Sequence, residues 1–212
     1  MHHTNRRGQR LGTLAGPVGG FAEYTTVSQL VATRIPKEMP LDRAALLACG
    51  VSTGFGAVIN RARVRAMDSV VVIGTGGVGV NSIQAARYAG ASPVIAVDIL
   101  ESKLATAIKF GATRTINLKE EKDPVKKVFE LTAGRGADFA FVTVGNVEAV
   151  RQGFSMCGPR GMTVVIGLMI NIYSCFFFGH LFVRRAFSLI LLIDRFQTDA
   201  SELYPRFVIQ PD

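Results

Sequence analysis

With 212 residues, of which 49% are hydrophobic and 19% charged, the chain has the composition of a globular protein with a core, which excludes an intrinsically disordered protein. Its net charge of +8 comes from scattered basic residues without interleaved aromatic residues, so the sequence indicates solvated faces and no nucleic-acid partner. Three irregularly spaced cysteines and a start without an apolar signal segment favour a reducing, cytoplasmic location.

Two elements are expected in the first part of the chain. Residues 20–27 predict a strand, because aromatic and β-branched side chains follow a pair of glycines. Residues 41–60 have helical character and predict a helix that breaks at Gly50 and resumes after Gly54. These elements precede the regular pattern that dominates the rest of the chain.

A strand–helix rhythm begins at residue 69. Apolar strands are indicated at residues 70–73, 94–97, 139–144 and 162–166. A helix over residues 102–110 is expected to stop at Gly111, and the next to begin with Asp123 as its N-cap and Pro124 in its first turn. Asn146 can cap a third helix, which ends near Cys157. Apolar strands that alternate with helices predict an α/β fold with a doubly wound parallel sheet, because parallel strands need helical crossovers.

A glycine motif joins the first of these strands to its helix. Residues 70–73 run directly into Gly74-x-Gly76-x-x-Gly79, and Asp98 closes the next apolar run. This order of strand, glycine turn, helix, strand and acid is typical of a dinucleotide site. Gly74 permits the tight turn, Gly76 lets the backbone approach a pyrophosphate, and Gly79 lets helix and strand pack closely. The motif therefore predicts a dinucleotide-binding site, in which the N-terminus of the helix faces the phosphates.

Several further segments resemble the zinc-dependent, medium-chain alcohol dehydrogenases. Besides the glycine turn they are residues 20–27, the run Cys49-Gly-Val-Ser-Thr-Gly-Phe-Gly, and Val97-Asp-Ile together with Lys103. They occur in the order of that family with near-family spacing, and the resemblance covers roughly residues 19–168. It implies NAD and zinc as cofactors and hydride transfer between a small-molecule alcohol, or its aldehyde or ketone, and the nicotinamide.

The resemblance also assigns residues to three parts of a bound NAD. The pyrophosphate would be held by Gly74, Gly76, Gly77, Val78 and Gly79. The adenosine ribose would be held by Asp98, with Lys103 beside it. The nicotinamide would lie near Thr53, Val144 and Leu168. No residue is assigned as a catalytic acid, base or nucleophile.

Cys49 matches one of the family's ligands to the catalytic zinc, and a thiolate suits that metal. The family's Gly-His-Glu ligand motif does not occur in the sequence, and neither does its four-cysteine lobe for a structural zinc. The chain is therefore expected to be a dehydrogenase truncated at its N-terminus and divergent near its end. We expect residues 1–59 to be a fragment of a second, mostly β catalytic domain, residues 60–168 the Rossmann domain, and residues 169–212 a divergent tail.

Three hypotheses for the function follow. The first is an NAD-dependent oxidoreductase of the zinc alcohol dehydrogenase type. The alternative is a dinucleotide-binding module without chemistry, because Cys49 is one candidate ligand where a catalytic zinc site has three. A membrane-attached protein is a third hypothesis, since residues 168–193 are largely apolar, but the polar residues among them disfavour a spanning helix. The same apolar segment is expected to promote self-association, which allows a homo-oligomer.

Overall fold

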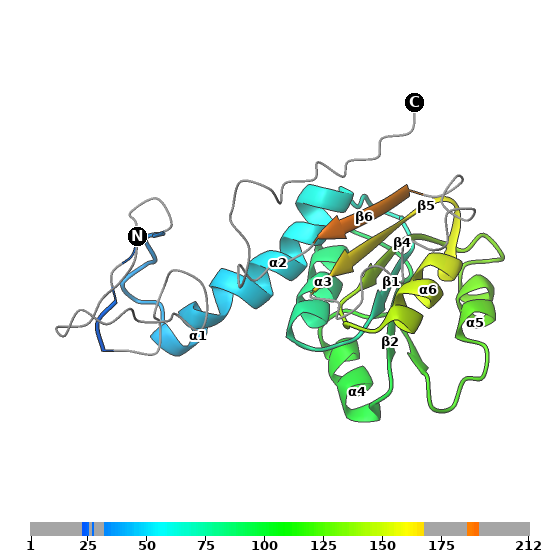
Figure 1. Ribbon diagram of the computed structural model, residues 1–212, viewed down its shortest axis with the longest axis horizontal. Helices are drawn as coiled ribbons and strands as arrows, with labels where there is room; N and C mark the ends of the chain where they lie inside the picture. The colour runs from blue at the N-terminus through cyan, green and yellow to red at the C-terminus, as the bar shows by residue number, and fades with distance from the viewer. Residues whose placement is uncertain (1–22, 26, 28–31, 168–185, 191–212) are drawn as a thin grey trace, which may run out of the picture. The chain divides into compact units, whose positions relative to one another are not determined.

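The chain divides into two compact units in the computed structural model (Figure 1). The residues that the structure describes are 23–25, 27, 32–167 and, for the backbone alone, 186–190. The first unit comprises Met1–Pro40 and Ile193–Phe207, and the second comprises Leu41–Leu192 and Val208–Asp212. All helices and strands of the described residues lie in the second unit.

The second unit is built on a parallel sheet of six strands in the order β3-β2-β1-β4-β5-β6. The strands are β1 Val70–Ile73, β2 Val94–Asp98, β3 Arg114–Asn117, β4 Ala137–Val142, β5 Cys157–Ile166 and β6 Ala186–Ile190. The strand order reverses between β1 and β4, and open α/β sheets bind ligands at the carboxyl ends of the strands at such a reversal. The glycine turn that follows β1 lies at this end of the sheet.

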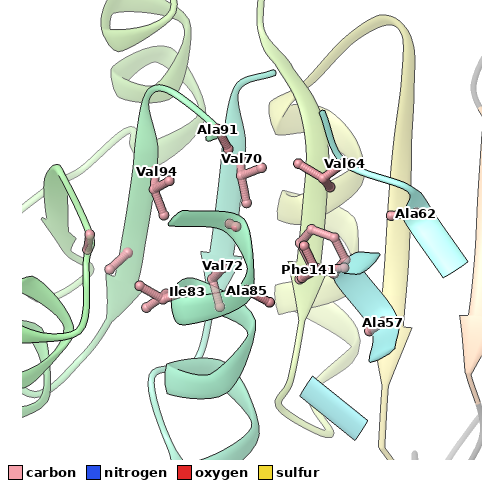
Figure 2. Close-up of a cluster of buried hydrophobic side chains, with 14 of the residues drawn as sticks. Ala57, Ala62, Val64, Val70, Val72, Ile83, Ala85, Ala91, Val94 and Phe141 are labelled. Carbon is pink, nitrogen blue, oxygen red and sulfur yellow. The ribbon is translucent and has the colours of Figure 1, made fainter. Parts of the chain in front are cut away.

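Helices cover both faces of the sheet, as a doubly wound fold requires. They are α3 Gly77–Tyr88, α4 Glu101–Lys109, α5 Pro124–Leu131 and α6 Val147–Met156. Because side chains alternate along a strand, Val70 and Val72 of β1 pack with α3 and α4 on one face (Figure 2). Val71 and Ile73 pack with α5 and α6 on the other. The predicted doubly wound parallel sheet is confirmed, and both faces of its central strands are buried.

The predicted ends of these helices are also confirmed. Gly111, with φ of +112°, follows α4 in the left-handed region. The Asp123 carboxylate accepts a hydrogen bond from the Lys126 N–H at 2.9 Å, and Pro124 is the first residue of α5. The Asn146 side chain accepts one from the Glu148 N–H at 2.8 Å at the start of α6.

The predicted break at Gly50 is wrong, because the chain is helical without interruption from residue 41 to residue 62. This helix consists of α1 Leu41–Leu46, the π-helical segment η2 Leu47–Val51, α2 Ser52–Gly56 and the π-helical segment η3 Ala57–Ala62. A glycine inside a helix costs only about 1 kcal/mol, which neighbouring hydrogen bonds and packing offset. By length and composition alone, the helix is apolar enough to cross a membrane, with a mean hydropathy of 1.2. However, Ala57, Val58 and Ala62 near its end are buried in the core beside the sheet.

Two further expectations differ from the structure. Of the strand predicted at residues 20–27, Glu23–Thr25 and Val27 are described, and they form no strand; the other four residues lie outside the described part. Tyr24 is 91% exposed, because none of the described strands pairs with this segment. The tail contributes an ordered element, since β6 pairs in parallel with β5. The hypothesis of a membrane-spanning helix over residues 168–193 is therefore wrong for residues 186–190, which form a strand. Apart from these, the residues of that segment that precede β6 and follow it lie outside the described residues.

Candidate dinucleotide-binding site

The glycine turn is anchored to the sheet on entry. The Gly74 N–H donates to the Val97 carbonyl oxygen of β2 at 2.8 Å, which continues the strand pairing by one residue. Gly74 then adopts φ of +90°, a conformation that L side chains rarely adopt. Helix α3 begins three residues later at Gly77, with Gly76 as its N-cap. No side chain among the described residues caps this N-terminus, so its first N–H groups are open to a ligand.

The glycines of the turn serve two different purposes. A Cβ at Gly79 would collide with the carbonyl group of Gly74, so this glycine permits α3 to begin directly against the turn. A Cβ at Gly76 or Gly77 would meet nothing within 4 Å. Both of these residues are exposed. Within the described protein, packing does not require glycine at these two positions. Glycine there leaves room for a ligand to lie directly on the backbone.

Two residues at the end of β4 hold the turn from one side. The Thr143 hydroxyl donates to the Gly74 carbonyl oxygen at 2.7 Å, with the Ile73 carbonyl oxygen at 3.2 Å. Val144 lies beside it, since a Cβ at Gly74 would be 2.5 Å from Val144 Cγ1. The structure thus brings Val144, which the sequence assigned to the nicotinamide, against the glycine turn.

Asp98 holds the turn from the opposite side, at the end of β2. Its Oδ2 accepts from the Thr75 N–H at 2.8 Å and from the Thr75 hydroxyl at 2.9 Å. Its Oδ1 accepts from the backbone N–H groups of Ile99 at 2.7 Å and Leu100 at 3.1 Å. Asp98 therefore ties the residue between two motif glycines to the loop that leads into α4.

These hydrogen bonds decide the charge of Asp98. Burial of the side chain alone would raise the pKa of the Asp98 carboxyl, because the charged form loses hydration. The hydrogen bonds from Thr75, Leu100 and Ile99 outweigh burial and lower that pKa below its usual value of 3.8. Asp98 is consequently an anion at neutral pH, placed next to the glycine turn.

Helix α2 approaches the start of α3 through Gly54. A Cβ at Gly54 would collide with the Val78 carbonyl oxygen and lie 2.9 Å from the Asn81 Cβ. The Ser82 hydroxyl lies 3.2 Å from the Gly54 carbonyl oxygen, which it can hydrogen-bond. This close packing places Thr53, the residue before Gly54, near the first turn of α3. Thr53 and Val78, which lie 25 positions apart in the sequence, are thereby brought to one end of the sheet.

For the remaining candidate residues, no described contact with the glycine turn is found. Lys103 is exposed in the first turn of α4, and its N–H donates to the Leu100 carbonyl oxygen at 3.0 Å. Leu168 lies outside the described residues. Cys49 is an exposed free cysteine in η2. Within the described part of the chain, no group of three or more His, Cys, Asp or Glu side chains is close enough to hold a metal ion.

Sequence reasoning missed Thr75 and Thr143. Thr75 occupies a position of the motif where any residue is allowed, so the motif itself carries no signal for its hydroxyl. Thr143 was visible as a polar residue within the otherwise apolar run over residues 139–144. A hydroxyl at the carboxyl end of a strand next to the glycine turn is a signal that could have been used.

The fold and the order of its elements define a Rossmann-type α/β protein. The model of the zinc-binding dehydrogenase family matches residues 77–196, and the chain belongs to this family. This match confirms the family that the sequence motifs indicated.

Solved structures agree with this assignment. An alcohol dehydrogenase zinc-binding domain protein from Burkholderia ambifaria is 38% identical, with a TM-score of 0.64, over 74% of this chain and 42% of that one. The benzyl alcohol dehydrogenase from Acinetobacter calcoaceticus is 33% identical, with a TM-score of 0.65, over 74% and 44%. An alcohol dehydrogenase from Thermus sp. ATN1 is 27% identical, with a TM-score of 0.64, over 75% and 46%. The chain therefore spans less than half the length of these structures.

Proposed function

We propose that the chain is the dinucleotide-binding part of an NAD-dependent oxidoreductase of the zinc alcohol dehydrogenase type. The bound nicotinamide would accept a hydride from an alcohol, or return it to the aldehyde or ketone. The observation that carries this proposal is the pairing of two features at one end of the sheet. An uncapped helix N-terminus has free space above Gly76 and Gly77, and the ionised Asp98 lies beside the same turn.

Each feature suits a different part of the dinucleotide. The first N–H groups of α3 carry a partial positive charge and can donate to the pyrophosphate, whose oxygens need no side chain to bind them. The Asp98 carboxylate can accept from a ribose hydroxyl, whereas the 2′-phosphate of NADP would bring a second negative charge against it. Val78 is proposed to belong to the pyrophosphate cradle with the glycines of the turn. Thr53, Val144 and Leu168 are proposed to lie near the nicotinamide, and Lys103 beside the adenosine ribose.

The described residues do not form a site for zinc. Cys49 is one candidate ligand, exposed on η2, and a catalytic zinc site uses three protein ligands. The division into residues 1–59, 60–168 and 169–212 remains a prediction. So do the location in a reducing compartment, the small alcohol substrate and the assembly into a homo-oligomer.

Cofactor preference tests the proposal. NAD and NADP are titrated against the wild-type chain and Asp98→Asn, with binding followed by calorimetry. Hydrogen bonds to a charged group contribute about 1.5–3 kcal/mol, so the wild type should prefer NAD by roughly ten- to a hundredfold, and the variant should lose most of that preference. Equal affinities of the wild type for NAD and NADP would contradict the assignment of Asp98.

The second candidate function is a dinucleotide-binding module without turnover, which the single candidate ligand Cys49 favours. Zinc content and NADH formation are measured on the same preparation over a panel of primary and secondary alcohols. Stoichiometric zinc with turnover supports the oxidoreductase. NAD binding without turnover at any alcohol supports the module.

A further inference from the structure

The Asp98 carboxylate has no unused acceptor position in this structure. An ionised carboxylate offers about four lone-pair sites, two on each oxygen. Oδ1 accepts from two backbone N–H groups, those of Ile99 and Leu100, at 2.7 and 3.1 Å. Oδ2 accepts from the N–H and the hydroxyl of Thr75 at 2.8 and 2.9 Å. A ribose hydroxyl that is to donate to Asp98 must therefore take the place of a donor already present.

Three of the four donors cannot leave without moving the backbone. The Thr75 N–H is fixed in the glycine turn, whose preceding residue is bonded to β2. The N–H groups of Ile99 and Leu100 belong to the link between β2 and α4, and the Leu100 carbonyl oxygen is bound by the first turn of α4. The Thr75 hydroxyl is different, because it is a side-chain donor that can be turned away from Asp98 Oδ2 by rotation about side-chain bonds without moving the backbone.

We infer that the Thr75 hydroxyl is an exchangeable donor, which yields its place on Asp98 Oδ2 to a hydroxyl of the adenosine ribose. This inference rests on the proposed function, because it takes Asp98 as the ribose-binding acid. Thr75 then sets the affinity for the ribose, since its hydroxyl competes with the ligand for one lone pair. In the free protein the hydroxyl satisfies a carboxylate that is only 7% exposed. In the complex the ribose satisfies it instead, and the freed hydroxyl can pair with the ribose oxygen.

Substitution of Thr75 tests the exchange in the full-length chain. Thr75→Ala and Thr75→Val remove the competing donor and leave three backbone donors to hold Asp98, while Thr75→Ser keeps a hydroxyl. The probe is ADP, which carries the adenosine ribose and the pyrophosphate. A single net hydrogen bond corresponds to a change of about two- to tenfold in affinity, so Thr75→Ala and Thr75→Val should bind ADP tighter than wild type by that factor. Thr75→Ser should bind ADP as the wild type does.

A second probe separates this competition from a structural role. 2′,3′-Dideoxy-ADP lacks both ribose hydroxyls, so the wild type and all three variants should bind it with equal affinity. Tighter ADP binding that persists with the dideoxy probe would overturn the inference. Unchanged or weaker ADP binding by both Thr75→Ala and Thr75→Val would overturn it as well, since the hydroxyl would then be neutral or required to position Asp98.

Failure of the inference can be told from failure of the proposed function. Asp98→Asn is titrated with ADP and with the dideoxy probe beside the Thr75 variants. Loss of ADP affinity in Asp98→Asn, with no gain in the Thr75 variants, overturns only the exchange. Equal affinities of wild type and Asp98→Asn for ADP would show that Asp98 does not bind the ribose. That result would overturn both the exchange and the proposed role of Asp98.

Discussion

The substitution Gly76→Ala should abolish most dinucleotide binding without affecting the stability of the protein. Gly76 has φ of −73° and ψ of −166°, which alanine adopts without strain, and a Cβ there would meet nothing within 4 Å. The free energy of unfolding should therefore change by no more than about 0.5 kcal/mol. The added methyl group would occupy the space in which the pyrophosphate approaches the turn. Overpacking of that kind costs about 1–3 kcal/mol, or roughly a five- to hundredfold increase in the Kd for NAD.

Gly79→Ala is the matched comparison, because its methyl group would be directed into the protein. The new Cβ would collide with the Gly74 carbonyl group and lie 3.1 Å from Thr143 Oγ1. The start of α3 would have to move, at a cost of about 3 kcal/mol, which corresponds to a fall of roughly 6–12 °C in Tm for a chain of this size. Thermal unfolding and NAD titration of both variants check the pair. Normal NAD affinity in a folded Gly76→Ala protein would refute the placement of the pyrophosphate on this turn.

Three further outcomes are expected from the same contacts. The hydrogen bonds to Asp98 lower its pKa, so the ionised side chain stabilises the fold above about pH 3.8, and this contribution is lost as the pH falls through the lowered pKa. In urea unfolding, the wild type should therefore exceed Asp98→Asn in stability by a constant amount from pH 7 to about pH 5. This difference should shrink below about pH 4. Asp123→Ala removes the N-cap of α5 and should lower the free energy of unfolding by about 1 kcal/mol, while Asp123→Asn, measured by the same denaturant titration, should retain most of it. Gly54→Ala forces a methyl group against the Val78 carbonyl oxygen and should destabilise by about 1–3 kcal/mol, whereas Gly56→Ala in the same helix meets only the Asn60 side chain at 3.7 Å and should leave the Tm unchanged or higher.

The sheet could be predicted from the sequence because its signals are local. Buried parallel strands appear as short apolar runs, and Asp123, Asn146 and Gly111 mark helix ends through hydrogen bonds or backbone conformations within a few residues. Strand β3 was not indicated, since only Ile116 of its four residues is buried at this edge of the sheet. Strand β6 was missed for another reason: its place depends on pairing with β5, and the surrounding sequence shows no period that predicts it.

The candidate site could be predicted only in part. The glycine spacing and Asp98 follow from a motif whose geometry is the same wherever it occurs. The partners of that motif are set by tertiary structure. Thr143 reaches Gly74 across 69 positions of the sequence, and Ser82 reaches Gly54 across 28. The saturation of Asp98 by four donors likewise arises where two segments, the glycine turn and the link between β2 and α4, meet at one carboxylate, which neither segment reveals alone.

The hydrogen bonds around the glycine turn imply that the candidate site is formed before any ligand binds. Gly74 is bonded to β2 through its N–H and to Thr143 through its carbonyl oxygen, and Thr75 is bonded to Asp98. A loop held on both sides in this way loses little conformational entropy when a dinucleotide arrives, so little of the binding energy is spent on ordering it. The helix N-terminus adds donors that are already aligned. The remaining change on binding is an exchange of hydrogen-bond donors at Asp98, because the carboxylate that would recognise the ribose already has a full set of donors. Affinity for the adenosine end should therefore depend less on building the site than on which hydroxyl, that of Thr75 or that of the ribose, occupies the last acceptor position of Asp98.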